Sequence, residues 1–271
     1  MLGPRTLVMG VINVTPDSFS DGGAALDPQH AAEIAVAMEA AGADILDVGA
    51  ESTRPGATPV GTADEMARVR PVMQAIARRV GIPISIDTYK SEVAELALGE
   101  GASIVNDISG LQYDPRLGAL TARTGAPIVL MHTRGRPQDM YAHADYDDVV
   151  GEVAADLRAA VSRAQAAGIA ADRILIDPGI GFAKRAAQSL AVLASLERLA
   201  ELGFPLLVGP SRKSFMAPAT GSLDPAARDW PTAAAVTAAV LGGAHIVRVH
   251  RVAEMVHVVR LADALRDAAA G

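Results

Sequence analysis

The sequence contains no cysteine, which excludes disulfide bonds, thiolate nucleophiles and zinc or iron–sulfur sites with cysteine ligands. An excess of positive charge is also missing, because the formal net charge is −7 and the pI is about 5.4. We therefore expect no nucleic-acid partner, and any anionic ligand must be bound by a few local cations. Aromatic residues make up only 3% of the chain, whereas half of the residues are hydrophobic, so the core is expected to be aliphatic.

No run of residues is long and apolar enough for a membrane span. The longest apolar region, residues 233–249, is interrupted by Gly242, Gly243 and His245. The first residues enter a strand-like run almost at once, without the basic flank, long apolar stretch and cleavage site of a signal peptide. The sequence therefore predicts a soluble, cytoplasmic protein with no membrane partner.

Short β-branched runs alternate along the chain with longer alanine-rich segments of helical period. The expected strands are 6–14, 44–50, 83–88, 103–109, 127–132, 174–179, 205–211 and 245–250. The expected helices are 31–42, 63–79, 91–99, 115–124, 147–168, 189–203, 232–243 and 252–270, of which 115–124 has the weakest pattern. Six glycines fall where such a helix needs a left-handed C-terminal residue: Gly42, Gly101, Gly125, Gly168, Gly203 and Gly243.

Eight strand–helix units in 271 residues predict a single (β/α)₈ TIM barrel domain, residues 1–271, with its active site at the carboxyl ends of the strands. A doubly wound open sheet is the alternative, because it has the same alternation. The barrel is favoured because eight units are present and no GxGxxG turn follows the first strand. The looser segments follow strands directly, which indicates elaborated loops on one face.

Polar or ionisable residues stand at the end of every expected strand. They are Asn13, Asp47 with Glu51, Asp87, Asn106 with Asp107, His132, Asp177, Ser211 with Lys213, and Arg248 with His250. Each residue alone has a structural interpretation, but buried charge is costly unless it is paired or functional, so the set together indicates a site.

The residue types of this set suggest its ligands. Acids and carboxamides beside a lysine suit a flat, nitrogen-rich heterocycle, whose edge presents N–H donors and a carbonyl. Arg248 and His250, near Asn13, suit an anion such as a phosphate with a hard metal ion, Mg²⁺. No serine–histidine–acid pattern with a nucleophile elbow supports covalent acyl transfer.

Seven motifs in this order make the sequence similar to the dihydropteroate synthases. They are NVTPDSFSDGG (13–23), ESTRPGA (51–57), SIDTYK (85–90), VNDISG (105–110), DPGIGFAK (177–184), GPSRKSF (209–215) and RVH (248–250). The resemblance implies a transferase that forms a C–N bond. Such enzymes join 6-hydroxymethyl-7,8-dihydropterin pyrophosphate to p-aminobenzoate, giving 7,8-dihydropteroate and pyrophosphate for folate synthesis.

The resemblance also implies roles for individual residues, position by position. The pterin is expected to contact Asp87, Asn106, Asp177 and Lys213, with Met131 lining its pocket. The pyrophosphate is expected to contact Asn13, Arg248 and His250. The p-aminobenzoate is expected to contact Phe19, Thr53, Arg54, Phe182 and Ser211. Asn13 is also expected to contact Mg²⁺. Asp87, Lys213 and Asp177 are the expected catalytic residues, and the resemblance suggests a homodimer.

Because an aromatic amine is a modest nucleophile, we expect a dissociative displacement of pyrophosphate without a covalent enzyme intermediate. The loops 15–25 and 51–62, rich in Gly, Ser, Pro and Thr, are expected to close over the second substrate. Two other functions remain open, a methyltetrahydrofolate-binding barrel and a non-catalytic pterin-binding paralogue.

One residue departs from the family pattern. Arg251 stands where family members often have an acid after RVH. It could be a neutral change at the start of a helix, an additional cation near the pyrophosphate, or the loss of an acid that supports His250.

Overall fold

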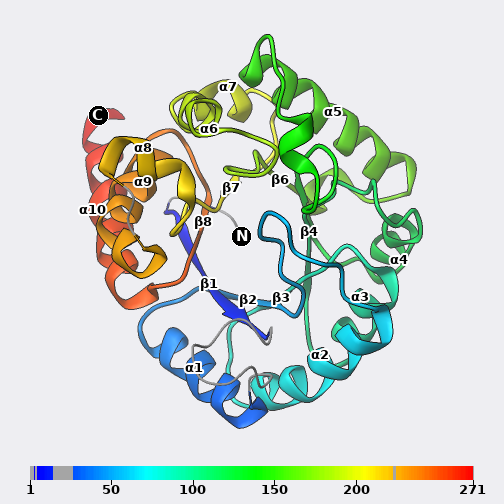
Figure 1. Ribbon diagram of the computed structural model, residues 1–271. Helices are drawn as coiled ribbons and strands as arrows, with labels where there is room; N and C mark the ends of the chain where they lie inside the picture. The colour runs from blue at the N-terminus through cyan, green and yellow to red at the C-terminus, as the bar shows by residue number, and fades with distance from the viewer. Residues whose placement is uncertain (1–2, 4, 15–26, 222–223, 271) are drawn as a thin grey trace.

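Eight parallel strands form an almost closed barrel surrounded by helices, which confirms the predicted (β/α)₈ fold (Figure 1). The computed structural model describes residue 3 and residues 5–14, 27–221 and 224–270. The strand order is β6-β5-β4-β3-β2-β1-β8-β7, and a parallel bridge between Ile176 and Leu206 joins the two ends of the sheet. The strands are β1 Leu7–Asn13, β2 Ile45–Gly49, β3 Ile84–Asp87, β4 Ile104–Asp107, β5 Ile128–Met131, β6 Ile174–Asp177, β7 Leu207–Val208 and β8 Ile246–Val249.

The helices follow the predicted order with two differences. They are α1 Pro28–Ala40, α2 Thr62–Ala77, α3 Ser91–Gly99, α4 Arg116–Thr124, α5 Val149–Ala166, α6 Ala186–Leu193, α7 Leu196–Ala200, α8 Ala217–Thr220, α9 Asp229–Leu241 and α10 Val252–Ala270. The predicted helix 189–203 is divided into α6 and α7, and the short α8 lies in a segment expected to be a loop. The weakest prediction, 115–124, does form a helix.

The glycine positions explain where several helices end. All six glycines singled out in the sequence have positive φ, between 69° and 110°. A side chain with a Cβ rarely adopts this conformation, so glycine lets the chain leave the helix and turn toward the next strand.

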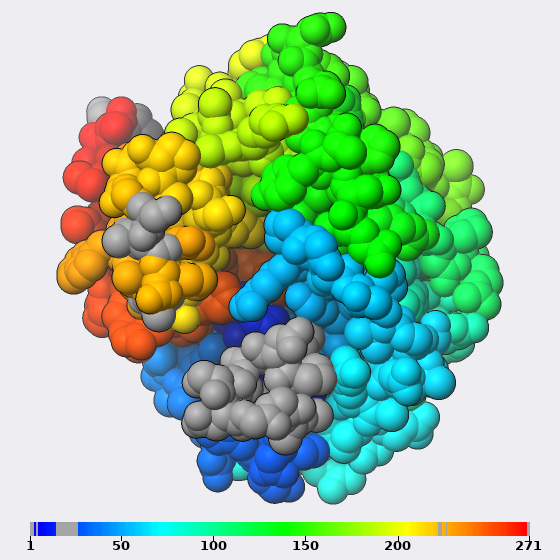
Figure 2. All heavy atoms as spheres, in the orientation of Figure 1, coloured from blue at the N-terminus to red at the C-terminus, as the bar shows by residue number. Residues whose placement is uncertain are grey.

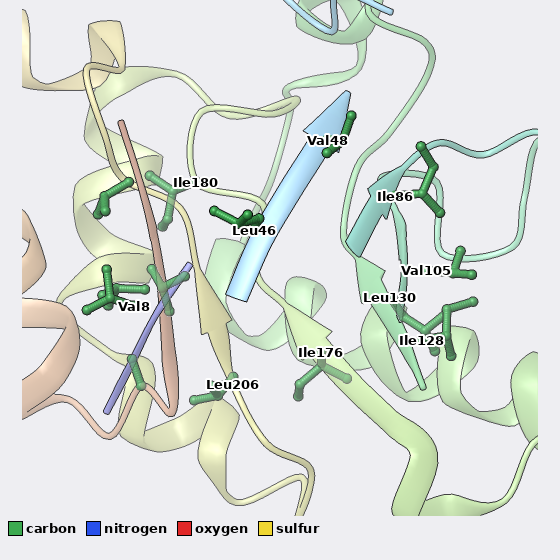
Figure 3. Packing of buried hydrophobic residues seen from close by; sticks show 14 of the residues in the cluster. Val8, Leu46, Val48, Ile86, Val105, Ile128, Leu130, Ile176, Ile180 and Leu206 are labelled. Carbon is green, nitrogen blue, oxygen red and sulfur yellow. The ribbon is translucent and has the colours of Figure 1, made fainter. Parts of the chain in front are cut away.

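The barrel interior consists of an apolar layer beneath a polar layer. Side chains alternate along each strand, so one set faces the helices and the next faces the barrel axis. The helix-facing set includes Val8, Leu46, Ile86, Leu130 and Ile176 (Figure 3). The lower axis-facing layer is a separate apolar cluster made of Met9, Ile45, Val129, Leu175, Leu207 and Ile246. This apolar cluster plugs the barrel. The axis-facing residues two positions further along each strand form the floor of the site.

Within the described part of the chain, no helix combines the length and the apolar character needed to cross a bilayer.

Candidate active site

An arginine held between two acids forms one half of the polar layer. Arg248 on β8 donates from Nε to Asp47 Oδ2 at 2.6 Å and from the terminal nitrogen Nη2 to Asp87 Oδ2 at 2.8 Å. Asn106 on β4 donates from Nδ2 to the same Asp47 oxygen at 3.1 Å. The four residues come from β2, β3, β4 and β8, so the closure of the barrel brings them together.

The electrostatics of this half follow from its burial. Burial raises the pKa of Asp87 to about 7; Arg248 opposes this shift and Asp47 adds to it. Burial disfavours the charged form of Arg248, but the two acids more than compensate and raise its pKa. Asp47 is fully buried, and its Oδ1, like the Oγ of its register partner Ser85, has no hydrogen-bond partner among the described residues. Buried polar atoms are ordinarily paired, so this floor suits a ligand with a polar edge.

Asp177 and Lys213 form the second half of the layer. Asp177 ends β6, and its Oδ1 accepts from the Gly179 amide at 2.7 Å. Lys213 Nζ donates to the Ile180 carbonyl at 2.6 Å and lies 4.6 Å from the centre of the Phe182 ring. Burial lowers the pKa of Lys213 to about 8, opposed by Asp177, and burial raises the pKa of Asp177, opposed by Lys213. The pair therefore presents an acceptor and a donor in the same buried layer.

The shifted pKa values of Asp87 and Lys213 predict a narrow pH optimum. If Asp87 stabilises positive charge, as the sequence predicts, it has to be ionised, so kcat/KM should rise as pH increases through about 7. If Lys213 donates to a ligand carbonyl, it has to be protonated, so kcat/KM should fall as pH increases beyond about 8. A pH profile of kcat/KM for the pterin substrate tests this expectation. A flat profile between pH 6 and pH 9, a range of about three units, would contradict it.

Ser211 and His250 contact each other at the ends of β7 and β8. Ser211 Oγ lies 2.8 Å from His250 Nδ1 and accepts from the His250 amide at 3.3 Å. Burial lowers the pKa of His250 to about 4, and the charges of Arg248, Arg212, Lys213 and Arg54 add to the effect. The imidazole is therefore neutral at physiological pH and can hydrogen-bond to an anion without carrying charge. The sequence assigned these two residues to different substrates, and the structure places them side by side.

The loop after β2 reaches across the mouth of the barrel (Figures 1 and 2). Lys90 donates to Glu51 at one end of the loop and to the Val60 carbonyl at the other, the latter at 2.8 Å. At the tip, the Gly56 amide donates to the Pro137 carbonyl at 2.9 Å. Thr53 and Arg54 lie within this loop, and Arg54 is exposed. Closure of residues 51–62 over a substrate stays a prediction, and loop 15–25 with Phe19 lies outside the described residues.

Asn13 and Met131 also end strands beside these groups. In register, Asn13 pairs with Gly49 and Gly49 pairs with Asp87. Because Gly49 has no side chain, it leaves space between Asn13 on β1 and Asp87 on β3. Met131 pairs with Asp177 and packs with Phe182, Tyr89 and Ile108 in a small apolar cluster.

Arg251 lies apart from the strand-end residues described above. Its Nε donates to Glu254 Oε1 at 2.9 Å, three residues along, and its side chain is 54% exposed. His250 is supported by Ser211 instead. Of the three interpretations, the structure therefore favours a change at the start of α10 that leaves the anion site unaltered.

Gly179 is a position where the backbone requires glycine. Its φ is +65°, and a Cβ built there would lie 2.0 Å from the His132 carbonyl oxygen. We expect Gly179→Ala to lower the free energy of unfolding by about 3 kcal/mol or more, because strain and overlap add. Chemical denaturation measures this. Gly203→Ala, where a Cβ would meet nothing within 4 Å, is the control and should cost less.

Two parts of the site were not found from the sequence. Asp47 was noted only as a strand end, and its pairing with Arg248 joins residues 201 positions apart. Lys184 was counted in the DPGIGFAK motif without a role, yet its side chain is fully buried. The strand-end position of Asp47 and the motif position of Lys184 were signals, but nothing in the local sequence indicates the partner of either residue.

The residues present suit a shared Mg²⁺ better than a closed metal site. Among the described residues, no group of three or more Asp, Glu or His side chains could hold a metal ion. The Asn13 carboxamide is a hard oxygen donor at the barrel mouth, near Asp87 in register. Mg²⁺ is commonly held by one or two protein ligands, substrate phosphates and water, and this donor set fits that pattern.

Known proteins resemble this chain over nearly its whole length. The pterin binding enzyme family matches residues 9–250. A dihydropteroate synthase of Synechocystis is 49% identical over 263 residues, covering 97% of this chain and 91% of that protein. The Xanthomonas albilineans dihydropteroate synthase with 4-aminobenzoic acid has a TM-score of 0.90 at 42% identity, covering 97% of this chain and 93% of the other. A structure of that enzyme in complex with 7,8-dihydropteroate has a TM-score of 0.88 at 38% identity, covering 98% and 95%. The chain therefore belongs to the pterin binding enzymes, and within them to the dihydropteroate synthases.

Proposed function

We propose that the polar layer above the barrel plug carries out the dihydropteroate synthase reaction of this chain. The amine of p-aminobenzoate displaces pyrophosphate from 6-hydroxymethyl-7,8-dihydropterin pyrophosphate. The C–O bond of the pterin methylene breaks, a C–N bond forms, and the amine loses a proton. The observation that carries the proposal is the polar layer itself, in which Asp87, Asn106 and Asp177 lie at the ends of strands and Lys213, in the loop after β7, lies with them around one floor.

The pterin ring fits the floor of this layer. Asp177 can accept from the N–H groups of the ring edge, and Lys213 can donate to its carbonyl. Asn106 supplies a donor and an acceptor on the opposite side, and Met131 packs against the ring face. Asp47 Oδ1 and Ser85 Oγ, which have no hydrogen-bond partner in the described part of the chain, support a ligand with polar groups at this depth.

The pyrophosphate lies, in this proposal, above the pterin and near Arg248, His250 and Asn13. Two of the five N–H groups of Arg248 are committed to Asp47 and Asp87, so those acids fix the direction of the guanidinium. His250 and Asn13 add neutral contacts. Mg²⁺, held by Asn13 and the substrate, would neutralise the charge of the leaving group.

The p-aminobenzoate site lies next to these groups. Phe182 offers a ring face, and Ser211, Thr53 and Arg54 lie at the ends or in the loops of β7 and β2. Arg54 provides a cation for the carboxylate of the substrate. Phe19 completes this set in the proposal.

The reaction proceeds, we propose, by dissociation. The carboxylate of Asp87 stabilises positive charge that develops on the pterin methylene, and Arg248 stabilises negative charge that develops on the leaving oxygen. A dissociative displacement by the amine needs no nucleophile from the enzyme, so no covalent enzyme intermediate is expected. Trapping of a covalent pterin–protein adduct during turnover would contradict this mechanism.

Pyrophosphate release tests the function directly. Purified protein is mixed with dihydropterin pyrophosphate and Mg²⁺, with and without p-aminobenzoate. We expect release that depends on p-aminobenzoate and matches the amount of dihydropteroate formed. Tight binding of the pterin without turnover would instead indicate a non-catalytic pterin-binding paralogue. Loss of turnover on chelation, restored by Mg²⁺, tests the metal.

A homodimer of this single-domain, cytoplasmic enzyme is a further part of the proposal. Large apolar side chains are exposed on the adjacent helices α9 and α10: Trp230, Leu241, Leu261 and Leu265, with Trp230 86% exposed. Exposed apolar groups gathered on adjacent helices often mark an interface. We expect sedimentation to give a dimer and Leu261→Glu with Leu265→Glu to give a monomer. Tyr141→Glu, a change of another exposed apolar side chain on the segment Met140–His143, is the control and should leave the dimer intact.

A further inference from the structure

Lys184 is a buried cation to which the proposed mechanism gives no role. The chain has 24 Lys and Arg residues but only three lysines, Lys90, Lys184 and Lys213, so arginine serves nearly everywhere else. All three follow strands at the same end of the barrel. Lysine is a compact point charge, whereas arginine needs room for a planar fork, so lysine suits confined places. Lys184 has the most confined place, since the residue is only 1% exposed.

The ammonium of Lys184 is surrounded by three acceptors. Nζ lies 2.7 Å from His132 Nδ1, 3.1 Å from the Gly179 carbonyl and 3.0 Å from the Phe182 carbonyl. An ammonium has three N–H donors, so the protonated form satisfies every contact. Burial lowers the pKa of Lys184 well below its ordinary value, and the charge of Asp177 opposes this shift.

The contact with Lys184 also fixes the tautomer of His132. Because Nδ1 accepts from the ammonium, the ring proton lies on Nε2, which is 3.1 Å from Asp156 Oδ2. Burial lowers the pKa of His132 to about 4, so the ring is neutral. Asp156 also accepts from Arg134, at 3.2 Å from Nε and 3.0 Å from a terminal nitrogen. A line of contacts therefore runs from Lys184 to the surface of α5.

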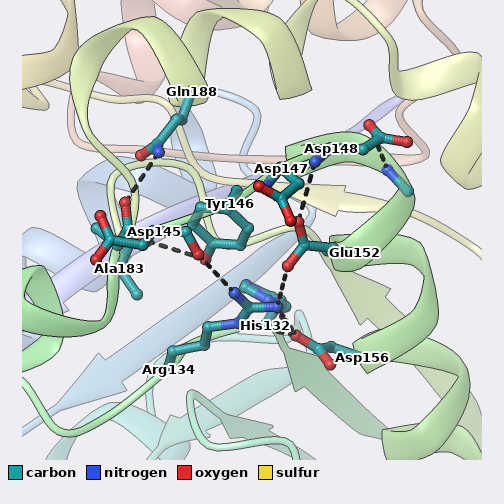
Figure 4. Close-up of polar contacts among 12 residues, drawn as sticks. His132, Arg134, Asp145, Tyr146, Asp147, Asp148, Glu152, Asp156, Ala183 and Gln188 are labelled. Atoms are coloured by element: carbon teal, nitrogen blue, oxygen red, sulfur yellow. Dashed lines mark hydrogen bonds and ion pairs between the residues drawn. The ribbon is translucent and has the colours of Figure 1, made fainter.

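The line of contacts returns from Arg134 to the loop after β6, which contains Ala183 and Lys184 (Figure 4). The guanidinium of Arg134 lies 4.2 Å from the centre of the Tyr146 ring. The Tyr146 hydroxyl donates to the Ala183 carbonyl at 2.9 Å. Ala183 precedes Lys184 and has a positive φ of 47°, a conformation that costs free energy in a residue with a Cβ. We call this closed path, Lys184–His132–Asp156–Arg134–Tyr146–Ala183, the loop circuit.

The loop circuit holds the segment from which two site residues take their positions. It binds the carbonyls of Gly179, Phe182 and Ala183, and the Ile180 carbonyl in the same segment accepts from Lys213. The same segment presents the Phe182 ring to Lys213. If the segment shifts, the Phe182 ring moves with it, and so does the Ile180 carbonyl that positions Lys213.

We propose that Lys184 is a positioning residue, which through the loop circuit sets Phe182 for p-aminobenzoate and Lys213 for the pterin without touching either substrate. The proposal rests on the proposed roles of Phe182 and Lys213. It does not depend on the neighbouring surface hollow of about 520 Å³, which Arg134 and Asp156 line from outside the barrel.

Lys184→Met tests the proposal, because methionine keeps most of the buried volume and removes the donors. We expect KM for p-aminobenzoate to rise about tenfold and kcat to fall by a similar factor, since small misplacements of substrate-binding groups are costly. Protein grown with lysine labelled at Cε with ¹³C gives only three side-chain signals. The Lys213 signal should be displaced in the variant. Wild-type kinetic constants together with an unmoved Lys213 signal would overturn the proposal.

Arg134→Met gives a second test if Lys184→Met fails to fold, because Arg134 lies partly exposed at the outer end of the circuit. We expect a smaller rise in KM for p-aminobenzoate, about threefold, and a displaced Lys213 signal. Arg158→Met, an exposed arginine on α5, the helix that carries Asp156, is the matched control and should match the wild type. Equal behaviour of the two arginine variants would overturn the proposal. The Lys213 signal needs no turnover, so this result is distinct from failure of the proposed function, which the wild-type assay reports.

Discussion

Arg248→Met should lower kcat/KM for dihydropteroate formation by about a thousandfold, as expected for the loss of a buried group that stabilises charge in the transition state. Among the described contacts, Arg248 is the only residue that forms an ion pair with Asp47 or with Asp87, and it pairs with both. Without it, two buried acids lie together unpaired, and Asp87 is expected to take up a proton. The variant therefore loses a cation at the leaving group and a carboxylate at the methylene.

Two further variants separate these effects from a general loss of charge. Arg251→Met removes another arginine, three residues along the chain, whose exposed side chain pairs with Glu254; its rate should stay within about twofold of the wild type. Arg248→Lys keeps the charge but cannot reach both acids with a planar fork, so it should recover only part of the activity. A fully active Arg248→Met enzyme would remove Arg248 from the mechanism.

Asp177→Asn should lower kcat/KM by about a thousandfold, because a site that accepts N–H groups discriminates strongly when the acceptor becomes a donor. The amide can keep the contact with the Gly179 amide through its oxygen, so the loop after β6 is expected to persist. What is lost is the negative charge that faces Lys213 and the second acceptor for the pterin edge. Steady-state kinetics with both substrates, together with pterin binding by calorimetry, measure the effect.

Asp107→Asn is the matched control for Asp177→Asn. Asp107 is equally buried at the end of a strand, but its oxygens accept from the Ser109 amide and hydroxyl and from the Leu111 amide. It therefore holds its own turn, and its replacement should reduce the free energy of unfolding by about 1–3 kcal/mol with a much smaller effect on the rate. If the two variants lost activity equally, the contrast between a structural and a ligand-binding acid would fail.

The sequence predicted the fold well because its signals are local. Short β-branched runs, segments of helical period and left-handed glycines such as Gly42 and Gly243 each depend on a few neighbouring residues. The errors also have local causes. The helix expected at 189–203 is divided near Ser195, and β7 is reduced to Leu207–Val208 although 205–211 has the composition of a strand.

The site was predictable only as a list of strand ends. Once the barrel was inferred, Asp87, Asn106 and Asp177 had to lie at one end. Their partners were not predictable, because contacts such as Arg248 with Asp47 depend on which inward positions meet when the barrel closes. The loop circuit is a similar case, since it joins residues of three different segments. Phe19 and the rest of loop 15–25 stay a prediction.

A crystal structure of the chain with 7,8-dihydropteroate tests the central claim most directly. We predict that the pterin edge lies within hydrogen-bond distance of Asp177, Asn106 and Lys213, above the apolar plug, with the p-aminobenzoate ring against Phe182. A pterin bound elsewhere, or one whose edge leaves Asp177 and Lys213 without contact, would contradict the account.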